Sequence, residues 1–216
     1  MKTVFQKYKH AWVFLYGLIY FPWFGYLEKT VTSNYHVIHT ALDDKIPFIE
    51  FFIVPYLLWF GFITFAAFYF FFTDKNDFYR MAIFTITGMT VFLIISTLYP
   101  NGQNLRPTEF ARDNIFVDMV NQVYKGDTPT NIFPSIHAYN SIAVYIAVCN
   151  SERLKNYKLI KYGSFSLTIL IILSTIFLKQ HSVVDVIGAI VLAIPAYYFT
   201  YSVEWKWMHV SKKITT

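Results

Sequence analysis

Charged residues are scarce in this chain of 216 residues: only 14% are Asp, Glu, Lys or Arg, whereas soluble domains usually contain about a quarter. Hydrophobic residues make up 56% of the chain and aromatic residues 21%. A water-soluble fold of this length needs far more polar surface than this composition supplies. The composition therefore excludes an ordinary soluble domain and indicates one integral membrane domain, residues 1–216.

Cysteine is nearly absent as well, because Cys149 is the single example. One thiol excludes an intramolecular disulfide and a cysteine-based metal site. The net charge of +5 comes without a basic stripe that carries interleaved stacking residues in a soluble segment, so we do not expect a nucleic-acid partner. No linker rich in proline or glycine and no internal repeat divides the chain.

Long apolar runs fill most of the remaining sequence. A membrane-spanning helix needs about 20 mostly apolar residues. Six segments reach or approach this length, namely 11–27, 51–73, 81–99, 134–150, 162–178 and 183–203. We therefore predict an all-α, polytopic membrane protein that is a bundle of six transmembrane helices.

The basic residues predict the orientation of these helices. Most of the 18 lysines and arginines lie before residue 11, in the segments 74–80 and 151–161, or after residue 203. Short cytoplasmic loops carry such an excess of basic residues. We expect a multi-pass protein of the cell membrane with both termini in the cytoplasm. The starts of the fourth and sixth segments then lie on the extracytoplasmic side, together with the loop 100–133.

His181 and Asp185 lie four residues apart at the start of the last apolar segment. On a helix, residues at this spacing share a face. A carboxylate that binds one imidazole nitrogen fixes the tautomer and leaves the other nitrogen free to attack phosphorus. The alternative interpretation is structural, because Ser182 followed three positions later by Asp185 resembles a capping box. The two interpretations are compatible.

A second polar motif, Pro134-Ser135-Ile136-His137, opens the fourth apolar segment. Pro and Ser are typical of a helix start, where free backbone N–H groups attract anions. His137 is placed to donate a proton to a leaving alkoxide as a general acid. A histidine that merely finds hydrogen-bond partners near the membrane interface is the structural alternative.

Two cations belong to the same predicted side. Arg106 offers a planar fork for phosphate oxygens, and Lys179 lies two residues before His181. The alternatives are an arginine at headgroup level and an interfacial lysine that snorkels. His36 and His39 supply only two ligands, whereas a zinc site needs about three or four, so no metal site is expected. The segment 109–124 has the pattern of an amphipathic outer helix.

Together, Arg106-Pro107, Pro134-Ser135-Ile136-His137 and the pair His181 and Asp185 resemble the motifs of the type 2 phosphatidic acid phosphatase superfamily, in the order that this family has them. The resemblance covers about 50–203, which we take as the catalytic core. It implies a six-helix membrane core, no metal and no cofactor.

The resemblance also implies a role for each matching residue. His181 corresponds to the nucleophile that becomes phosphohistidine, and Asp185 to its orienting partner. His137 corresponds to the acid for the leaving group, and Arg106 to a phosphate clamp. Ser135 and the backbone around it would help to cradle the phosphate.

The chain departs from the family pattern at three positions. Tyr99 stands where the family has a lysine, Ile136 stands where it has glycine, and Thr175 follows Ser174 where it has arginine. We expect Lys179 to replace one missing cation and Gln103 or Asn104 to help through hydrogen bonds. With these three departures, the chain resembles the branch of the family that contains sphingomyelin and inositol phosphorylceramide synthases.

The prediction from sequence is a metal-independent lipid phosphate phosphatase that acts on membrane lipids at the extracytoplasmic face. Phosphatidate, a polyprenyl pyrophosphate and phosphatidylglycerophosphate all fit as substrates. One alternative is a lipid phosphotransferase that moves a phospho-headgroup to a lipid alcohol. A second alternative is a non-enzymatic membrane protein, which the missing family cations favour.

Overall fold

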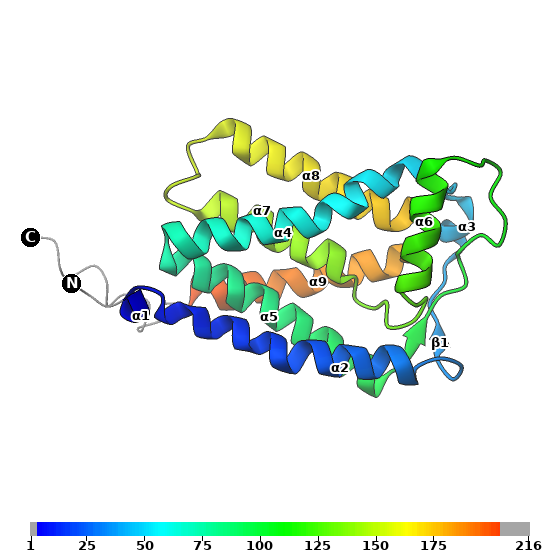
Figure 1. Cartoon of the computed structure of the whole chain (residues 1–216), viewed down its shortest axis with the longest axis horizontal. Helices are drawn as coiled ribbons and strands as arrows, with labels where there is room; N and C mark the ends of the chain where they lie inside the picture. The colour runs from blue at the N-terminus through cyan, green and yellow to red at the C-terminus, as the bar shows by residue number, and fades with distance from the viewer. Residues whose placement is uncertain (1–3, 204–216) are drawn as a thin grey trace, which may run out of the picture.

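The structure is a computed structural model that describes residues 4–203. The basic residues expected on the cytoplasmic side after residue 203 lie outside this range. Helices that run roughly side by side form a bundle (Figure 1). They are η1 Lys9–Tyr16, α2 Gly17–Thr30, α4 Ile53–Thr73, α5 Lys75–Leu98, α7 Ile136–Asn150, α8 Lys158–Phe177 and α9 Val183–Tyr197, which continues into η3 Tyr198–Ser202.

Short elements complete the described chain. They are α1 Val4–Lys7, β1 His36–Val37, α3 Ala41–Lys45, η2 Glu50–Phe52, β2 Asn101–Gly102 and α6 Ile115–Gly126. The two strands pair in parallel, with His36 opposite Asn101. Elements β1, α3 and α6 gather at one end of the bundle, whereas α1 lies at the other end (Figure 1).

Four helical segments of the described chain are long and apolar enough to cross a membrane: Glu50–Thr73, Lys75–Leu98, Lys158–Phe177 and Val183–Ser202. The protein is therefore a helical, multi-pass membrane protein, as predicted. The expected span 11–27 corresponds to η1 followed by α2, and the expected span 134–150 corresponds to α7, which has 15 residues. Six spans and cytoplasmic termini stay predictions.

Helix α7 is interior to the bundle, which explains why it is less apolar than its neighbours. It packs against α4, α5, α8 and α9. Its alanines Ala138 and Ala143 are buried against Ala189 and Ala193 of α9. Small side chains let helix backbones approach closely. Because α7 faces protein more than lipid, its polar first turn is tolerated and serves the site described below.

Gly88 allows the closest of these approaches, between α5 and α7. A Cβ atom at Gly88 would lie 2.0 Å from Cε1 of Tyr139, whose buried hydroxyl donates to the Phe84 carbonyl over 2.9 Å. We expect Gly88→Ala to destabilise the fold by about 1–3 kcal/mol through overpacking. Thermal unfolding in detergent measures this. The control is Gly25→Ala, because no atom lies within 4 Å of a Cβ there. Equal unfolding midpoints for the two variants would contradict the expected packing.

Helix α6 lies across the end of the bundle, nearly perpendicular to α4 and α8 (Figure 1). It is the amphipathic helix expected at 109–124, but it begins later, because Asn114 caps it by accepting from the backbone N–H groups of Phe116 and Val117. Its buried residue Val120 packs with Ile53 of α4 and with Leu178. The helix therefore covers the end of the bundle where the two histidine motifs lie.

Candidate active site

His181 and Asp185 are in contact at the start of α9. The Nδ1 atom of His181 lies 3.2 Å from Oδ2 of Asp185, and both side chains are buried. The same carboxylate oxygen accepts the backbone N–H of Ser182 over 2.8 Å, which completes a capping box. The catalytic and the structural interpretation of this sequence are thus compatible in the fold.

The helix-face argument for this pair is nevertheless wrong in one respect. Ser182 has extended backbone angles (φ −74°, ψ 156°) and is the N-cap, so α9 begins at Val183 and His181 lies outside the helix. The contact forms because the chain turns sharply after α8, where Lys179 has a φ of 54°. The N–H of Gln180 bonds to the Thr175 carbonyl across this turn, as in a Schellman motif.

The second motif forms the start of α7. Ser135 is its buried N-cap, and its hydroxyl accepts the N–H of Ala138 over 3.3 Å. His137 is the second residue of the helix. Within the described chain, the backbone N–H groups of Ile136 and His137 have no hydrogen-bond partner. They point out of the positive end of the helix dipole, where anions bind favourably.

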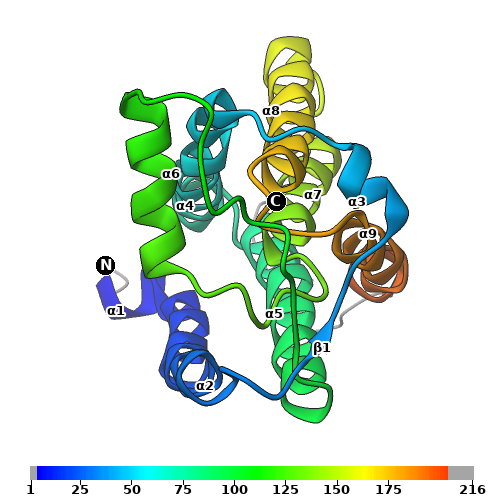
Figure 2. The ribbon, with the colours of Figure 1, turned by 90° about the vertical axis from the view of Figure 1, so that its right-hand side faces the viewer.

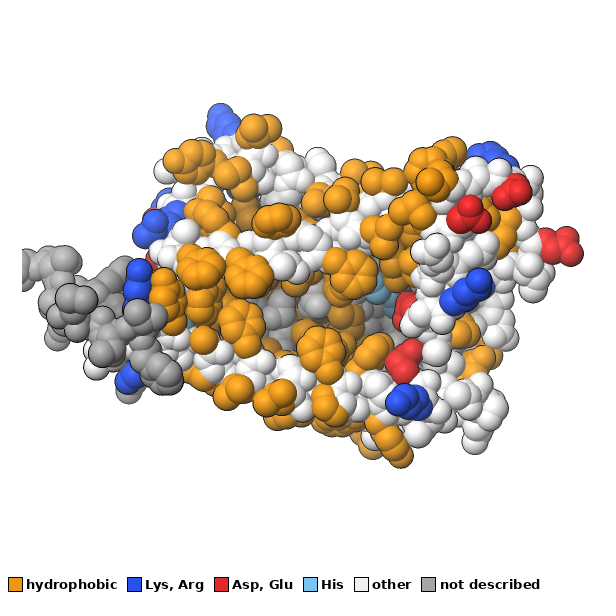
Figure 3. Space-filling view, in the orientation of Figure 1, with side chains coloured by type: hydrophobic (Ala, Val, Ile, Leu, Met, Phe, Trp, Pro, Cys, Tyr) orange, Lys and Arg blue, Asp and Glu red, His pale blue; other side chains and the backbone are white. Residues whose placement is uncertain are grey.

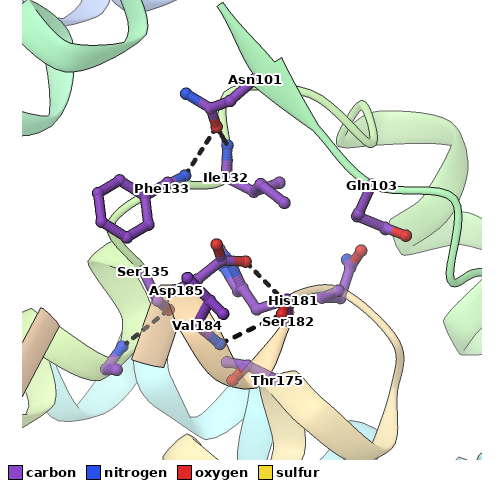
Figure 4. A network of polar contacts seen from close by, with 12 residues as sticks. Asn101, Gln103, Ile132, Phe133, Ser135, Thr175, His181, Ser182, Val184 and Asp185 are labelled. Atoms are coloured by element: carbon purple, nitrogen blue, oxygen red, sulfur yellow. Dashed lines mark hydrogen bonds and ion pairs between the residues drawn. The ribbon is translucent and has the colours of Figure 1, made fainter. Parts of the chain in front are cut away.

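A backbone hydrogen bond joins the two motifs directly, from the Ser135 N–H to the Asp185 carbonyl over 3.1 Å. The ring centroids of His137 and His181 are 5.8 Å apart. Asn101 fixes the approach to α7, because its side-chain oxygen accepts the N–H groups of Ile132 and Phe133 (Figure 4). Two histidines that are 44 positions apart in the sequence therefore share one polar cluster.

Aromatic side chains of α4 surround His137. Tyr56 stacks on its ring at a centroid distance of 4.7 Å, and Trp59 lies at 4.3 Å. Among the described residues, neither ring nitrogen of His137 has a hydrogen-bond partner. Sequence reasoning missed both aromatics, because a tyrosine and a tryptophan in an apolar span look like lipid-facing residues.

Arg106 reaches this end of the bundle but is engaged by protein oxygens. Its terminal nitrogens donate to the carbonyls of Tyr124, Asp127 and Thr128 and, over 2.5 Å, to Oε1 of Gln180. Its Nε atom is buried and has no hydrogen-bond partner among residues 4–203. A guanidinium has five N–H groups, and four of those in Arg106 bind oxygens of the surrounding loops. In the part of the chain that the structure describes, only the N–H at Nε is available to a ligand.

Lys179 and Gln103 are engaged in the same way. The Lys179 ammonium donates to the carbonyls of Asp43 and Ile46, over 2.7 and 2.5 Å. Burial lowers its pKa, and the carboxylates of Asp43 and Asp44 oppose this shift. Gln103 donates to the Lys179 carbonyl over 2.9 Å and accepts the N–H of Leu105. Both side chains therefore shape the loops that bear His181.

Asp127 is a carboxylate near the histidines that sequence reasoning missed. Its Oδ2 atom lies 3.4 Å from the Tyr56 hydroxyl and 3.3 Å from Nε2 of Gln180. Burial raises its pKa, while the charges of Arg106 and His181 partly offset this effect. In the sequence, Asp127 is an ordinary acidic residue of a polar loop and belongs to no motif. Its place beside the two histidines is therefore visible only in the fold.

A second missed carboxylate, Asp43, comes from the loop between α2 and α4. Its side chain is 1% exposed and accepts the Ser182 hydroxyl over 2.7 Å and the Val183 N–H over 2.9 Å. Burial alone would raise its pKa, but these hydrogen bonds and those from Thr40 lower it below the ordinary value. The sequence signal was local: Thr40 and Asp43 form a capping box of α3.

No cluster of three or more His, Cys, Asp or Glu side chains that could hold a metal ion occurs between residues 4 and 203. The two histidines once considered for such a site have other contacts. His39 pairs with Asp44 over 2.7 Å, and His36 stacks on Tyr99 at a centroid distance of 4.2 Å.

The surface is hollowed between α2 and α4, as Figure 3 shows. Hydrophobic side chains border the hollow, and a histidine is visible at one end of it, beside acidic side chains. On this face, an apolar hollow therefore meets the polar end of the bundle. Such an arrangement suits a ligand that combines an apolar tail with a polar head.

In chemical terms, the site offers a buried imidazole whose Nδ1 is bound to a carboxylate and whose Nε2 is free of partners among the described residues. A second imidazole faces it, and two unpaired N–H groups mark a place for an anion. An imidazole so oriented is an effective nucleophile, and a second one nearby is suited to proton transfer.

Comparison with protein-family models matches residues 102–209 to the PAP2 superfamily. The match includes both histidine motifs and Arg106. No curated protein and no solved structure matches the chain.

Proposed function

The chain belongs to the PAP2 superfamily, and we propose that it is a lipid phosphate phosphatase of the membrane that works through a phosphohistidine intermediate. The superfamily fits a membrane enzyme of the phosphatase type. The observation that carries the proposal is the geometry of three side chains: two imidazoles with centroids 5.8 Å apart, one of which is bound to Asp185.

In the first step, Nε2 of His181 attacks phosphorus and the bond from phosphorus to the lipid oxygen breaks. His137 gives a proton to the departing alkoxide, which leaves as a lipid alcohol. Asp185 stabilises the positive charge that develops on His181, since its carboxylate binds Nδ1. In the second step, His137 takes a proton from water, water attacks phosphorus, and His181 is released with inorganic phosphate.

The phosphate group is expected at the N-terminus of α7 rather than at that of α9. The N–H groups of Ile136 and His137 are unpaired in the described structure, whereas Asp43 and Asp185 already occupy the start of α9. A dianion at α7 gains from the helix dipole and from direct hydrogen bonds. The buried Nε–H of Arg106 is a further candidate donor.

The test is product analysis with purified enzyme in detergent micelles that contain phosphatidate and a metal chelator. We expect inorganic phosphate and diacylglycerol in equal amounts, and we expect no effect of the chelator, because the proposed steps use only side chains of the chain. Absence of phosphate release from phosphatidate, polyprenyl pyrophosphate and phosphatidylglycerophosphate alike would contradict hydrolysis.

The charge around the site favours a second candidate, a lipid phosphotransferase that uses a phosphodiester donor. Arg106 and Lys179 are bound to protein oxygens, and the half-buried carboxylate of Asp127 lies beside Tyr56. A phosphodiester carries one negative charge less than a fully ionised monoester, and a cationic headgroup would pair with Asp127.

Donor selectivity separates the two candidates. With phosphatidylcholine as donor and ceramide as acceptor, a transferase forms sphingomyelin, and Asp127→Asn is expected to lower its kcat/KM about tenfold, the effect of losing one charged contact worth about 1.4 kcal/mol. The control is Asp118→Asn, on the same outer segment in α6. Release of phosphate from phosphatidate without headgroup transfer would exclude this candidate.

A further inference from the structure

The short segment that carries His181 is attached at both of its ends to one outer loop. On one side of His181, the Lys179 ammonium donates to the carbonyls of Asp43 and Ile46. On the other side, Ser182 and Val183 donate to the Asp43 carboxylate. Figure 2 shows α3, the helix that carries Asp43, lying beside the start of α9.

The two attachments are reciprocal. Asp43 supplies a carboxylate to the N-terminus of α9, and Lys179 supplies a cation to the carbonyls at the end of α3. Each charge therefore meets the helix end that it stabilises. The three side chains of this arrangement are buried, because Asp43 is 1% exposed, Lys179 9% and Ser182 0%.

We propose that Asp43 and Lys179 form a clasp that positions the nucleophile His181 for phosphoryl transfer. Neither side chain contacts the His181 ring in the described structure, so both are positioning residues. The clasp acts through Ser182: its hydroxyl binds Asp43 while its N–H binds Asp185, the partner of His181. This inference rests on the proposed function, in which His181 attacks phosphorus.

The turn before His181 explains why a clasp is needed. Lys179 has a φ of 54°, a left-handed conformation in which a non-glycine residue is disfavoured. His181 itself precedes α9, so no helical hydrogen bond of α9 fixes its backbone. The His181 N–H bonds to the Thr175 carbonyl over 3.0 Å, which holds the segment to the end of α8. The contacts of Asp43 and Lys179 add a restraint from the outer loop on the opposite side.

Two variants break the clasp from opposite sides, Asp43→Asn and Lys179→Met. We expect each to lower kcat about 100-fold with little change in KM, because a displacement of about 1 Å of a reacting group costs this much. The double variant is expected to lose no more than the worse single variant, since both disrupt the same unit. Lys179→Arg keeps the charge and is expected to restore most of the rate.

The matched control is Asp44→Asn, one residue along the same helix. Asp44 is exposed and pairs with His39, outside the clasp. We expect wild-type kcat for this variant. Thermal unfolding of all variants separates misplacement of His181 from loss of the fold. Wild-type kcat in folded Asp43→Asn and Lys179→Met would overturn the proposal, and so would additive losses in the double variant.

A readout independent of catalysis separates this inference from the proposed function. Hydrogen–deuterium exchange of the peptide 176–186 is expected to increase in Asp43→Asn and Lys179→Met but not in Asp44→Asn. If the wild-type enzyme transfers no phosphate, the proposed function fails, whereas the exchange result still tests the clasp. Unchanged exchange in both clasp variants would overturn the clasp even if His181 proves to be the nucleophile.

Discussion

Replacing His181 with alanine is expected to abolish turnover, with a loss of about 10⁴-fold or more, as for other covalent nucleophiles. The buried imidazole lies with Nδ1 on Asp185 and Nε2 free, and a methyl group can neither attack phosphorus nor carry the phosphoryl group. Rapid-quench experiments with ³²P-labelled phosphatidate measure the effect. Wild-type protein should carry a ³²P label that is stable in alkali and is lost in acid, which is the behaviour of phosphohistidine. The His181→Ala variant should carry no such label.

The matched control for this result is His36→Ala. His36 stacks on Tyr99 at the same end of the molecule but is exposed and lies in β1 rather than in the polar cluster. We expect wild-type turnover and labelling from this variant. Substantial turnover in His181→Ala, or acid-labile label that persists in it, would exclude His181 as the attacking group.

Replacing Asp185 with asparagine is the second large effect, an expected loss of about 10³- to 10⁴-fold in kcat with the fold intact. The Asp185 carboxylate accepts from Nδ1 of His181 and from the Ser182 N–H. An asparagine side chain still caps the start of α9. It removes the negative charge that stabilises a positively charged His181, and it permits the His181 tautomer that carries its proton on Nε2. Steady-state kinetics with phosphatidate measures the loss in kcat, and thermal unfolding checks that the fold is intact.

Asp74→Asn provides the comparison. Asp74 caps α5 through the N–H groups of Asn76 and Asp77, and asparagine is about as good a cap as aspartate. We expect wild-type kinetics from this variant. If Asp185→Asn lost less than about tenfold, the carboxylate would be a helix cap, whose loss costs about 1 kcal/mol, and not a catalytic partner.

The candidate site could be located from sequence because its two histidines and Asp185 lie in short local motifs. A serine before a helix start and an aspartate three positions later predict a capping box, and the fold has this capping box at Ser182 and Asp185. Membership of the PAP2 superfamily, inferred from the order of the motifs, is confirmed. The membrane class followed from composition, since lipid contact demands apolar surface.

The partners of the charged side chains could not be predicted. Lys179 and Arg106 were expected at the phosphate, and in the fold their donors also contact backbone carbonyls of outer loops. Which carbonyls lack a partner depends on how the loops cross the end of the bundle, and no local pattern encodes that. The roles of these two cations at a substrate stay predictions.

The chain's residues alone specified the apolar helices and the chemistry of the two histidine motifs, because hydrophobicity, helix caps and side-chain pKa ranges are properties of short segments. The fold alone decided that Asp43 and Asp127 lie beside those motifs and that His181 precedes its helix. Contacts between segments more than 100 positions apart, such as Asp43 with Ser182, depend on how whole helices pack, which no short segment encodes.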